Sequence, residues 1–389
     1  MLSSVLEFVP QQDAEVFAQA SASAAVFALH GDAGSEPYIS RSKNLRRRLL
    51  RLLSEREGEL TRRLHLRERV RRIEYWPVAS DFESQFVLYR ALRQFFPHTY
   101  RERLRLRPAP LIKLNLDNPY PRAYVTTRLG RQNGKSLYFG PFASRPAAEK
   151  FLNDSLDFFK MRRCVDDLNP DPAFPGCIYS EMKMCLAPCF RGCTDQQYVD
   201  EVARVRRFLE SAGDSLRREV EGERDQASAE LHFESAGLLH ARLIKVNDAA
   251  GQRPEIARRL DHLNGLMVQP AIEPGAVTFF RVEAGAISEP IVFRVSAEAA
   301  QYAAGDAAAR QRHSMEARIS QALEVAPSAP PLPSNELMEH VALLKRWWFR
   351  SQKSGELFLA ENGVLPMRRI VRGISRIFAG NQPEHQPNL

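Results

Sequence analysis

Apolar residues along the first hundred positions change between the spacing of strands and that of helices. Two short apolar runs, 24–29 and 36–39, predict strands, and a helical stretch is expected to open the chain. Leu45, Leu49 and Leu52 recur at spacings of four and three, which predicts a helix over 40–53 with one buried stripe. A neighbouring stripe of this helix carries Arg41, Asn44, Arg48 and Arg51. The pattern therefore predicts a small α+β unit that presents a basic helix.

The rest of the chain changes spacing several times. Asn133, Gly134 and Lys135 separate two strand-like runs and predict a β-hairpin. Helical spacing returns over 145–159, 196–246 and 336–350, a second hairpin is expected around 284–288, and the proline-rich stretch 327–335 predicts a stiff linker. We expect a multidomain α+β protein whose parts are 1–105, 106–200, 201–250, 251–326 and 336–389.

Length, hydropathy and charge narrow the class of protein. The 389 residues suffice for two or three folding units, and no apolar stretch approaches the roughly 18 residues that a membrane-spanning helix needs. The start has no basic flank before its short apolar stretch, so we expect a cytoplasmic protein without a secretory signal. The formal net charge is +8 and most of the cations are arginines, which favours a polyanionic partner such as nucleic acid.

The five cysteines all lie between positions 164 and 193. An odd number of cysteines without a secretory signal argues against a disulfide framework and for a metal-ligand cluster in a reducing compartment. Four thiolates select zinc or an iron–sulfur cluster. No paired Cys-x-x-Cys knuckles and no histidine occur within the cluster, so the spacing favours iron–sulfur, with zinc as the alternative.

Three motifs follow one another in the middle of the chain: YFGPFASRPAAEKFL at 138–152, the Arg163-Cys164 pair, and GCIYSEMKMCLAPCFRGC at 176–193. In this order they resemble the middle of the UvrC family of bacterial excinucleases. In that family four cysteines bind an iron–sulfur cluster. The resemblance implies that the ligands here are Cys164, Cys177, Cys185 and Cys189, and Cys193 has no counterpart.

The segment 227–246 resembles the UVR motif of the same family, with His232 in place of the usual aspartate. In the family this helical hairpin docks on the helicase UvrB, which implies a UvrB-like partner here. An intramolecular helical hairpin is the alternative. The expected partner-binding residues are Leu231, Phe233, Ala236, Leu239 and Leu243, and the first two are expected at a turn between two helices.

By the same resemblance, residues 25–27 and 38–40 occupy the two triplets that name the GIY-YIG nuclease domain. Tyr38 would then help activate water, with Arg48 and Arg41 supporting the phosphate charge. The metal-binding glutamate of the family is replaced by Leu88 or Tyr89, neither of which can hold magnesium or manganese. The resemblance therefore implies a degenerate GIY-YIG domain with impaired or lost cutting. The expected nucleic-acid contacts are Lys43, Asn44, Arg46 and Arg47.

The sequence favours a DNA-repair protein that binds DNA and a UvrB-type partner. The rival hypothesis is an active structure-specific DNA endonuclease in which another acid holds Mg²⁺ or Mn²⁺. A role on RNA stays open, because phosphate contacts do not distinguish the nucleic acids. Residues 250–389 carry no chemistry that the sequence identifies, and Trp347 is expected to pack within its helix bundle.

Overall fold

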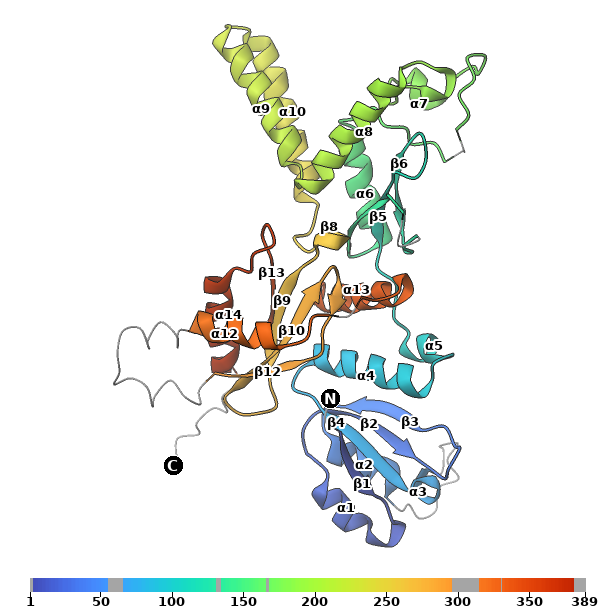
Figure 1. Ribbon diagram of the computed structural model, residues 1–389, viewed down its shortest axis with the longest axis vertical. Coiled ribbons are helices and arrows are strands. Elements are labelled where there is room, and N and C mark those ends of the chain that lie inside the picture. Colours follow the sequence, from blue (N-terminus) through green and yellow to red (C-terminus); the bar gives the residue numbers. More distant parts are fainter. Residues whose placement is uncertain are drawn as a thin grey trace, which may run out of the picture.

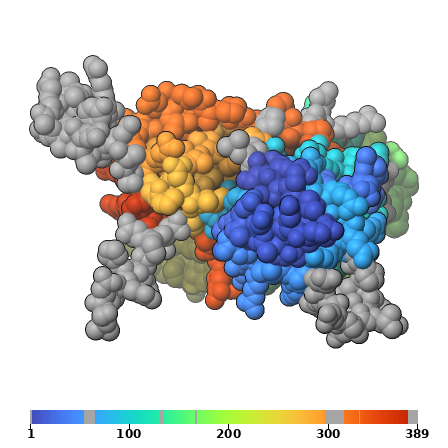
Figure 2. All heavy atoms as spheres, turned by 90° about the horizontal axis from the view of Figure 1, so that it is seen from below, coloured from blue at the N-terminus to red at the C-terminus, as the bar shows by residue number. Residues whose placement is uncertain are grey.

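The computed structural model describes residues 3–54, 66–130, 134–165, 168–295, 315–329 and 331–380. Three β-sheets follow one another along the molecule, with the N-terminal unit at one end and a helical hairpin at the other (Figure 1). Seen from the N-terminal end, the N-terminal unit lies directly against the C-terminal region (Figure 2). Within the described ranges, no helix is both long and apolar enough to cross a membrane.

The N-terminal unit is a four-stranded antiparallel sheet with helices on both faces. Its elements are β1 (Ser4–Glu7), η1 (Pro10–Gln12), α1 (Asp13–Gln19), β2 (Ala25–His30), β3 (Tyr38–Ser42), α2 (Leu45–Leu53), α3 (Leu66–Arg69), β4 (Arg72–Pro77), α4 (Asp81–Phe95) and α5 (Tyr100–Leu104). The strand order is β1-β4-β2-β3, which leaves β3 at an edge. Leu45, Leu49 and Leu53 of α2 pack on one face, and α4 covers the other.

The helical stretch expected ahead of residues 24–29 is present as η1 and α1, but the sequence analysis missed the strand β1, which precedes it and pairs antiparallel with β4. The basic helix begins at Leu45 rather than near position 40, so Arg41 lies on β3. Asn44 is the N-cap of α2, since its side-chain oxygen accepts the Arg47 N–H at 2.9 Å.

Helix α4 is apolar on two sides because it lies between two parts of the chain. Val87 and Ala91 pack against the N-terminal sheet. Phe82 and Phe86 pack edge-to-face against Phe280 of the C-terminal region. A helix that is apolar all round is a buried helix. The N-terminal unit is therefore joined to the C-terminal region through a shared hydrophobic core.

The middle part contains a second four-stranded sheet and the cysteine segment. Its elements are β5 (Leu111–Asn115), β6 (Arg122–Thr126), β7 (Leu137–Gly140), α6 (Arg145–Leu156), α7 (Ile178–Glu181), η2 (Pro188–Phe190), α8 (Asp195–Glu210) and β8 (Arg258–Arg259). The strand order is β6-β5-β7-β8, so β6 and β7 are not neighbours. The hairpin expected between them is wrong because β5, with Leu111, Ile112 and Leu114 buried, is the central strand that both of them pair with.

Helices α9 (Asp214–Ala229) and α10 (Phe233–Gly251) form an antiparallel pair that projects from the body of the molecule (Figure 1). The helical run expected over 196–246 is thus three helices, α8, α9 and α10. The chain turns at Gly213, where φ is +91°, and at Leu231, where φ is +63°. Leu231 and Phe233 flank the turn between the two helices, as the sequence predicts.

The C-terminal region is a third sheet covered by helices. Its elements are η3 (Leu260–His262), β9 (Gly265–Pro270), β10 (Ala276–Glu283), β11 (Ala286–Ile287), β12 (Ile291–Arg294), α12 (Met315–Val325), α13 (Ser334–Trp348), β13 (Glu356–Leu359) and α14 (Met367–Gly380). The expected hairpin near 284–288 is confirmed as β10–β11. Trp347 is buried and donates its indole N–H to the Ser354 carbonyl at 3.1 Å, which confirms a packing role. The molecule is mixed α and β with several sheets, which confirms the expected class at that level.

Candidate functional site

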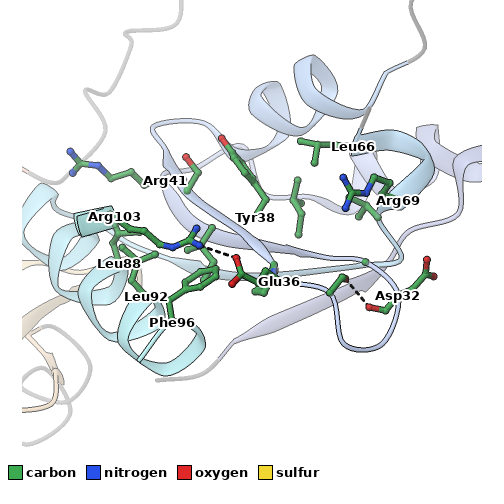
Figure 3. Close-up of a pocket in the computed structure, with 17 residues that line it drawn as sticks. Asp32, Glu36, Tyr38, Arg41, Leu66, Arg69, Leu88, Leu92, Phe96 and Arg103 are labelled. Atoms are coloured by element: carbon green, nitrogen blue, oxygen red, sulfur yellow. Dashed lines mark hydrogen bonds and ion pairs between the residues drawn. The ribbon is translucent and has the colours of Figure 1, made fainter. Parts of the chain in front are cut away.

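A cavity of about 600 Å³ lies around the edge strand β3 of the N-terminal unit (Figure 3). One side of it is apolar, with Leu88, Leu92 and Phe96 at the α4 side. Tyr38 on β3 and Arg69 at the end of α3 line it as well. The volume falls within the range of about 300–1,000 Å³ that is usual for ligand sites. The open edge of the sheet is therefore hollowed, with an apolar α4 side and polar and charged residues elsewhere.

Tyr38 lines this cavity, and Arg48 contacts Tyr38 from α2 without lining the cavity itself. The Arg48 guanidinium, carried by α2, donates to the Tyr38 hydroxyl at 3.4 Å. The ring of Tyr38 packs on Phe27, which holds the hydroxyl in place. The Nε of Arg48 is buried and has no hydrogen-bond partner in the described part of the chain. The pair thus offers a hydroxyl and a cation that is only weakly held by the protein.

Arg41 lies on β3 too, but it faces α4, because side chains alternate across a strand. Its guanidinium donates to Asp81 at 3.1 Å, and Asp81 also pairs with Arg350 of the C-terminal region. Arg41 lines the cavity, yet its charge is partly neutralised by this carboxylate. Of the three residues predicted for catalysis, Tyr38 and Arg41 therefore line the cavity, and Arg48 contacts Tyr38.

The two positions considered for the lost glutamate have opposite surroundings. Leu88 lines the cavity, whereas Tyr89 is buried on the other side of α4 and donates its hydroxyl to Glu339 at 3.1 Å. Burial and the neighbouring Glu339 raise the pKa of Tyr89, so it stays neutral. Of the two positions, Leu88 is therefore the one that lines the cavity.

Glu83 is the acid of α4 that lies nearest in sequence to Leu88, and it forms hydrogen bonds at the start of that helix. It is buried at the start of α4, where its carboxylate accepts the Ala79 N–H at 2.8 Å and its own N–H bonds the Ser80 hydroxyl at 3.0 Å. Burial raises the pKa of Glu83. Both bonds stabilise the start of the helix, and Glu83 does not line the cavity.

Two acids that the sequence did not single out do line the cavity. Glu36 pairs with Arg103 at 2.8 Å, and Arg103 also lies over the Phe96 ring at 3.7 Å. Asp32 pairs with Arg71 at 3.2 Å and is largely exposed. Both acids lie in the loop just before Tyr38, a position that could have drawn notice because that loop enters the candidate triplet. Each is already engaged by an arginine.

The residues predicted to bind nucleic acid differ in whether their side chains are already bonded within the protein. Lys43 and Arg47 are exposed at the start of α2, with no ion pair in the part of the chain that is described. Arg46 donates to the Ala18 and Ala20 carbonyls, both at 2.9 Å, and so ties α2 to the end of α1. Asn44 caps the helix. Lys43 and Arg47 are therefore the two members of the set whose charges point to solvent.

The four predicted cysteine ligands lie near one another. Burial raises the pKa of Cys185 to about 11, and the thiols of Cys164, Cys189 and Cys177 add to the rise. Arg162, buried behind the segment, approaches the Cys164 sulfur to 3.4 Å. Among the described residues, however, no three or more of Cys, His, Asp and Glu are placed to hold a metal ion. The donor set has the right chemistry for a soft metal, and the thiols are within electrostatic range without forming a closed ligand shell.

The predicted partner-binding residues divide between the surface and the core of the helical hairpin. Leu231 and Phe233 at its tip are 70% and 67% exposed. Leu243 is buried between the helices, and Ala236 and Leu239 are half-buried. Leu238, which the sequence analysis did not select, is 74% exposed. A partner can reach the apolar tip, whereas Leu243 serves the packing of α9 against α10.

The amino-acid sequence is similar to one protein family and to several known proteins. Residues 109–208 match the family described as UvrC/Cho excinuclease, middle domain. UvrABC system protein C of Idiomarina loihiensis is 29% identical over 246 residues, 59% of this chain and 38% of that protein. The same protein of Rickettsia africae is 27% identical, covering 53% of this chain and 32% of its own length. That of Chlamydia caviae is 24% identical, covering 67% and 43%.

No solved structure matches the chain. The chain spans only about a third to two fifths of the length of these curated relatives. Strands β5, β6 and β7, helix α6, the cysteine segment and most of α8 fall within the matched family domain. The middle part of the chain is therefore similar to the UvrC/Cho excinuclease family.

Proposed function

We propose that this protein works in nucleotide excision repair by binding DNA and a UvrB-like helicase, with its own nuclease activity impaired or lost. The relatives named above are UvrABC system proteins, which supports the repair role. The observation that carries the loss of cutting is Leu88, an apolar residue on the cavity that also holds Tyr38. We place this activity in the cytoplasm.

We assign residues 1–105 to a degenerate GIY-YIG domain. The Tyr38–Arg48 contact, the edge position of β3 and the basic start of α2 support this assignment. A tyrosine and an arginine can still hold a phosphodiester through hydrogen bonding and charge. Cutting also needs a divalent metal to generate the nucleophile, and the α4 side of the cavity supplies leucines and Phe96.

An active endonuclease that makes a single incision is the second candidate, and a specific observation favours it. Asp32 and Glu36 line the cavity and could ligate Mg²⁺ or Mn²⁺ if they released Arg71 and Arg103. Each release would leave an arginine without its partner. That cost makes binding without cutting the better supported function.

The middle part, 106–200, is proposed to hold an iron–sulfur cluster through Cys164, Cys177, Cys185 and Cys189, with zinc as the alternative. The assignment is supported by the proximity of these thiols, since neighbouring thiols raise the pKa of Cys185 and of Cys189. A bound cluster would cross-link a segment whose helices, α7 and η2, are only one turn long.

The helical hairpin, within 201–250, is proposed to dock on the UvrB-like helicase through its exposed tip. Leu231 and Phe233 place exposed apolar side chains at the tip of the hairpin, and Leu238 is exposed further along α10. Exposed apolar groups of this size mark interaction sites. The regions 251–326 and 336–389 are proposed to support the N-terminal unit through the shared core around α4.

DNA binding is tested by removing Lys43 and Arg47 together as alanines. Each lost phosphate contact should lower the slope of log affinity against log salt by about 0.9, so the pair should lower it by about 1.8. A matched control replaces Arg145 and Lys150, an exposed arginine and lysine on α6, with alanine. Fluorescence anisotropy with labelled duplex DNA gives both slopes. Equal slopes for the wild type and the Lys43/Arg47 variant would reject this face as the DNA contact.

A further inference from the structure

A second, smaller cavity of about 290 Å³ lies between the segment after α5 and the last turns of α13. Four of the six residues that line it are cations, and the other two are Leu106 and Ala342. The cations are Arg105, Arg107, Lys345 and Arg346. We propose that this cationic pocket binds a phosphate of a nucleic-acid strand.

The charges of the cationic pocket are not neutralised by the protein. None of its four cations forms an ion pair with a carboxylate in the described part of the chain, and no carboxylate lines the pocket. The ammonium group of Lys345 reaches only the Pro108 carbonyl, at 3.5 Å. Like charges held this close repel one another unless an anion lies between them.

Burial and neighbouring cations both act on the basic groups of the pocket. Burial lowers the pKa of Lys345, and the charge of Arg107 lowers it further. Burial and the charge of Arg41 lower the pKa of Arg346. A bound anion would offset the repulsion from these neighbouring cations. Lys345 and Arg346 suit the C-terminal end of α13 because of the helix dipole, but that does not explain why Arg105 and Arg107 face them from another element.

Neighbouring cations on the same elements show the contrast. Arg101 of α5 is paired with Glu339 of α13 at 2.7 Å, and Arg93 of α4 is paired with Glu336. The acids of α13 thus lie at its start, where arginines of the N-terminal unit meet them. At its other end, arginines meet further cations. Charges are therefore paired where the start of α13 meets the N-terminal unit, and the cations at the end of α13 have no carboxylate beside them among the described residues of the cationic pocket.

The size and chemistry of the pocket fit a phosphate group. Its volume is at the lower limit of the roughly 300–1,000 Å³ of small-molecule sites, which leaves room for a phosphate and its sugar rather than a large cofactor. Arginine presents a planar fork of donors that matches phosphate oxygens. Three arginines and a lysine around one small space therefore select an anion with several oxygens.

The link to Arg41 favours a nucleic-acid strand over a free anion. Arg41 lines the cavity at β3, and its charge is felt by Arg346 in the cationic pocket. A strand held at the Tyr38–Arg48 pair could lay a further phosphate into the cationic pocket. This inference rests on the proposed function, because it assumes that the N-terminal unit binds DNA. It adds a contact made by the C-terminal region, through α13, which lies beside α5 (Figure 1).

The test uses the full chain with Arg107 and Lys345 both replaced by glutamine. The control replaces Arg368 and Arg372, exposed residues of α14 with the same total charge, by glutamine. Anisotropy with labelled single-stranded and duplex DNA is measured over a salt series. The Arg107/Lys345 variant should bind about tenfold or more weakly at low salt, with a slope smaller by about 1.8 on duplex DNA. Its thermal midpoint should stay equal or rise, since repulsion has been removed, whereas a structural role would lower it.

Other outcomes decide against the inference in distinct ways. Wild-type affinity and slope in the Arg107/Lys345 variant, together with a loss in the Lys43/Arg47 variant, would leave the proposed function standing and overturn the cationic pocket. An equal loss of DNA affinity in the Arg368/Arg372 control would show that net charge alone causes the effect, which would overturn the cationic pocket. Stabilisation by pyrophosphate that the Arg107/Lys345 variant loses while keeping its DNA affinity would assign the pocket to a free anion. A wild-type chain that binds no DNA would overturn both proposals.

Discussion

Lowering the pH should loosen the junction between the N-terminal unit and the C-terminal region through one buried histidine. His340 on α13 packs against the rings of Phe86 and Tyr89 of α4. Its Nδ1 accepts the Ile287 N–H at 3.0 Å, which requires that nitrogen to be unprotonated. Burial, reinforced by Arg93 and Arg90, lowers the pKa of His340 from 6.5 to about 4.

The size of the effect follows from that pKa. The unfolded chain takes up a proton at this site near pH 6.5, whereas the folded chain resists it down to about pH 4. The contribution of His340 is therefore complete above pH 6.5 and is lost progressively as the pH falls towards 4. A gap of about 2.5 pH units corresponds to about 3 kcal/mol of unfolding free energy, at about 1.36 kcal/mol per unit.

Urea denaturation at neutral pH and at about pH 4, followed by tryptophan fluorescence, measures this loss. Trp347 reports on the right place, because it packs against Phe82 in the same core. Carboxylates also titrate in this range, so His340→Asn, whose amide oxygen can still accept the Ile287 N–H, isolates the histidine. Its loss between the two pH values should be about 3 kcal/mol smaller than in the wild type.

The exposed His98 provides the control, since His98→Asn should retain the full wild-type loss. The reasoning is refuted if His340→Asn and the wild type lose the same unfolding free energy on acidification. That result would mean that the pKa of His340 is the same in the folded and the unfolded chain.

Two further predictions concern the partner and the cofactor. Phe233→Ala should weaken binding to a UvrB-like helicase about tenfold or more, as measured by calorimetric titration. The thermal midpoint should not change, because the ring is 67% exposed. Retained affinity would show that the interface does not include the tip of the hairpin. Protein purified without oxygen should be brown and contain iron, which Cys185→Ser should reduce sharply; stoichiometric zinc without iron would select the alternative metal.

Local features of the fold were readable from the sequence where one periodicity dominates. The leucines at 45 and 49 predict the buried stripe of α2, and both are fully buried. The turn at Leu231 and the β10–β11 hairpin were likewise expected. The contact between Tyr38 and Arg48 was expected from the resemblance to the UvrC family, and the structure brings the two side chains together.

Features that depend on distant pairing were not readable. Strand β5 is central because it pairs with both β6 and β7. The Asn133-Gly134-Lys135 sequence before β7 therefore misled the prediction of a hairpin. The place of Arg41 on β3 depends on where α2 begins, and Asn44 as N-cap sets that point. A helical period alone could not separate these two short elements.

The interactions between the N-terminal unit and the C-terminal region were invisible for the same reason. The cationic pocket joins Arg107 to Lys345, which are far apart in the sequence, and only the packing of α13 beside α5 brings them together. The two acids on the cavity at β3, Asp32 and Glu36, lie in a loop without periodicity, so no pattern marked them.

Whether the protein binds DNA without cutting it is tested most directly by one incision assay. Purified full chain is incubated with damaged or branched DNA and Mg²⁺ or Mn²⁺, beside Tyr38→Phe and Arg48→Ala, and strand cleavage is measured together with binding. We predict that the wild type binds the DNA and leaves it uncut, as both variants do. Cleavage by the wild type that both substitutions abolish would contradict this account and establish an active nuclease at the β3 cavity.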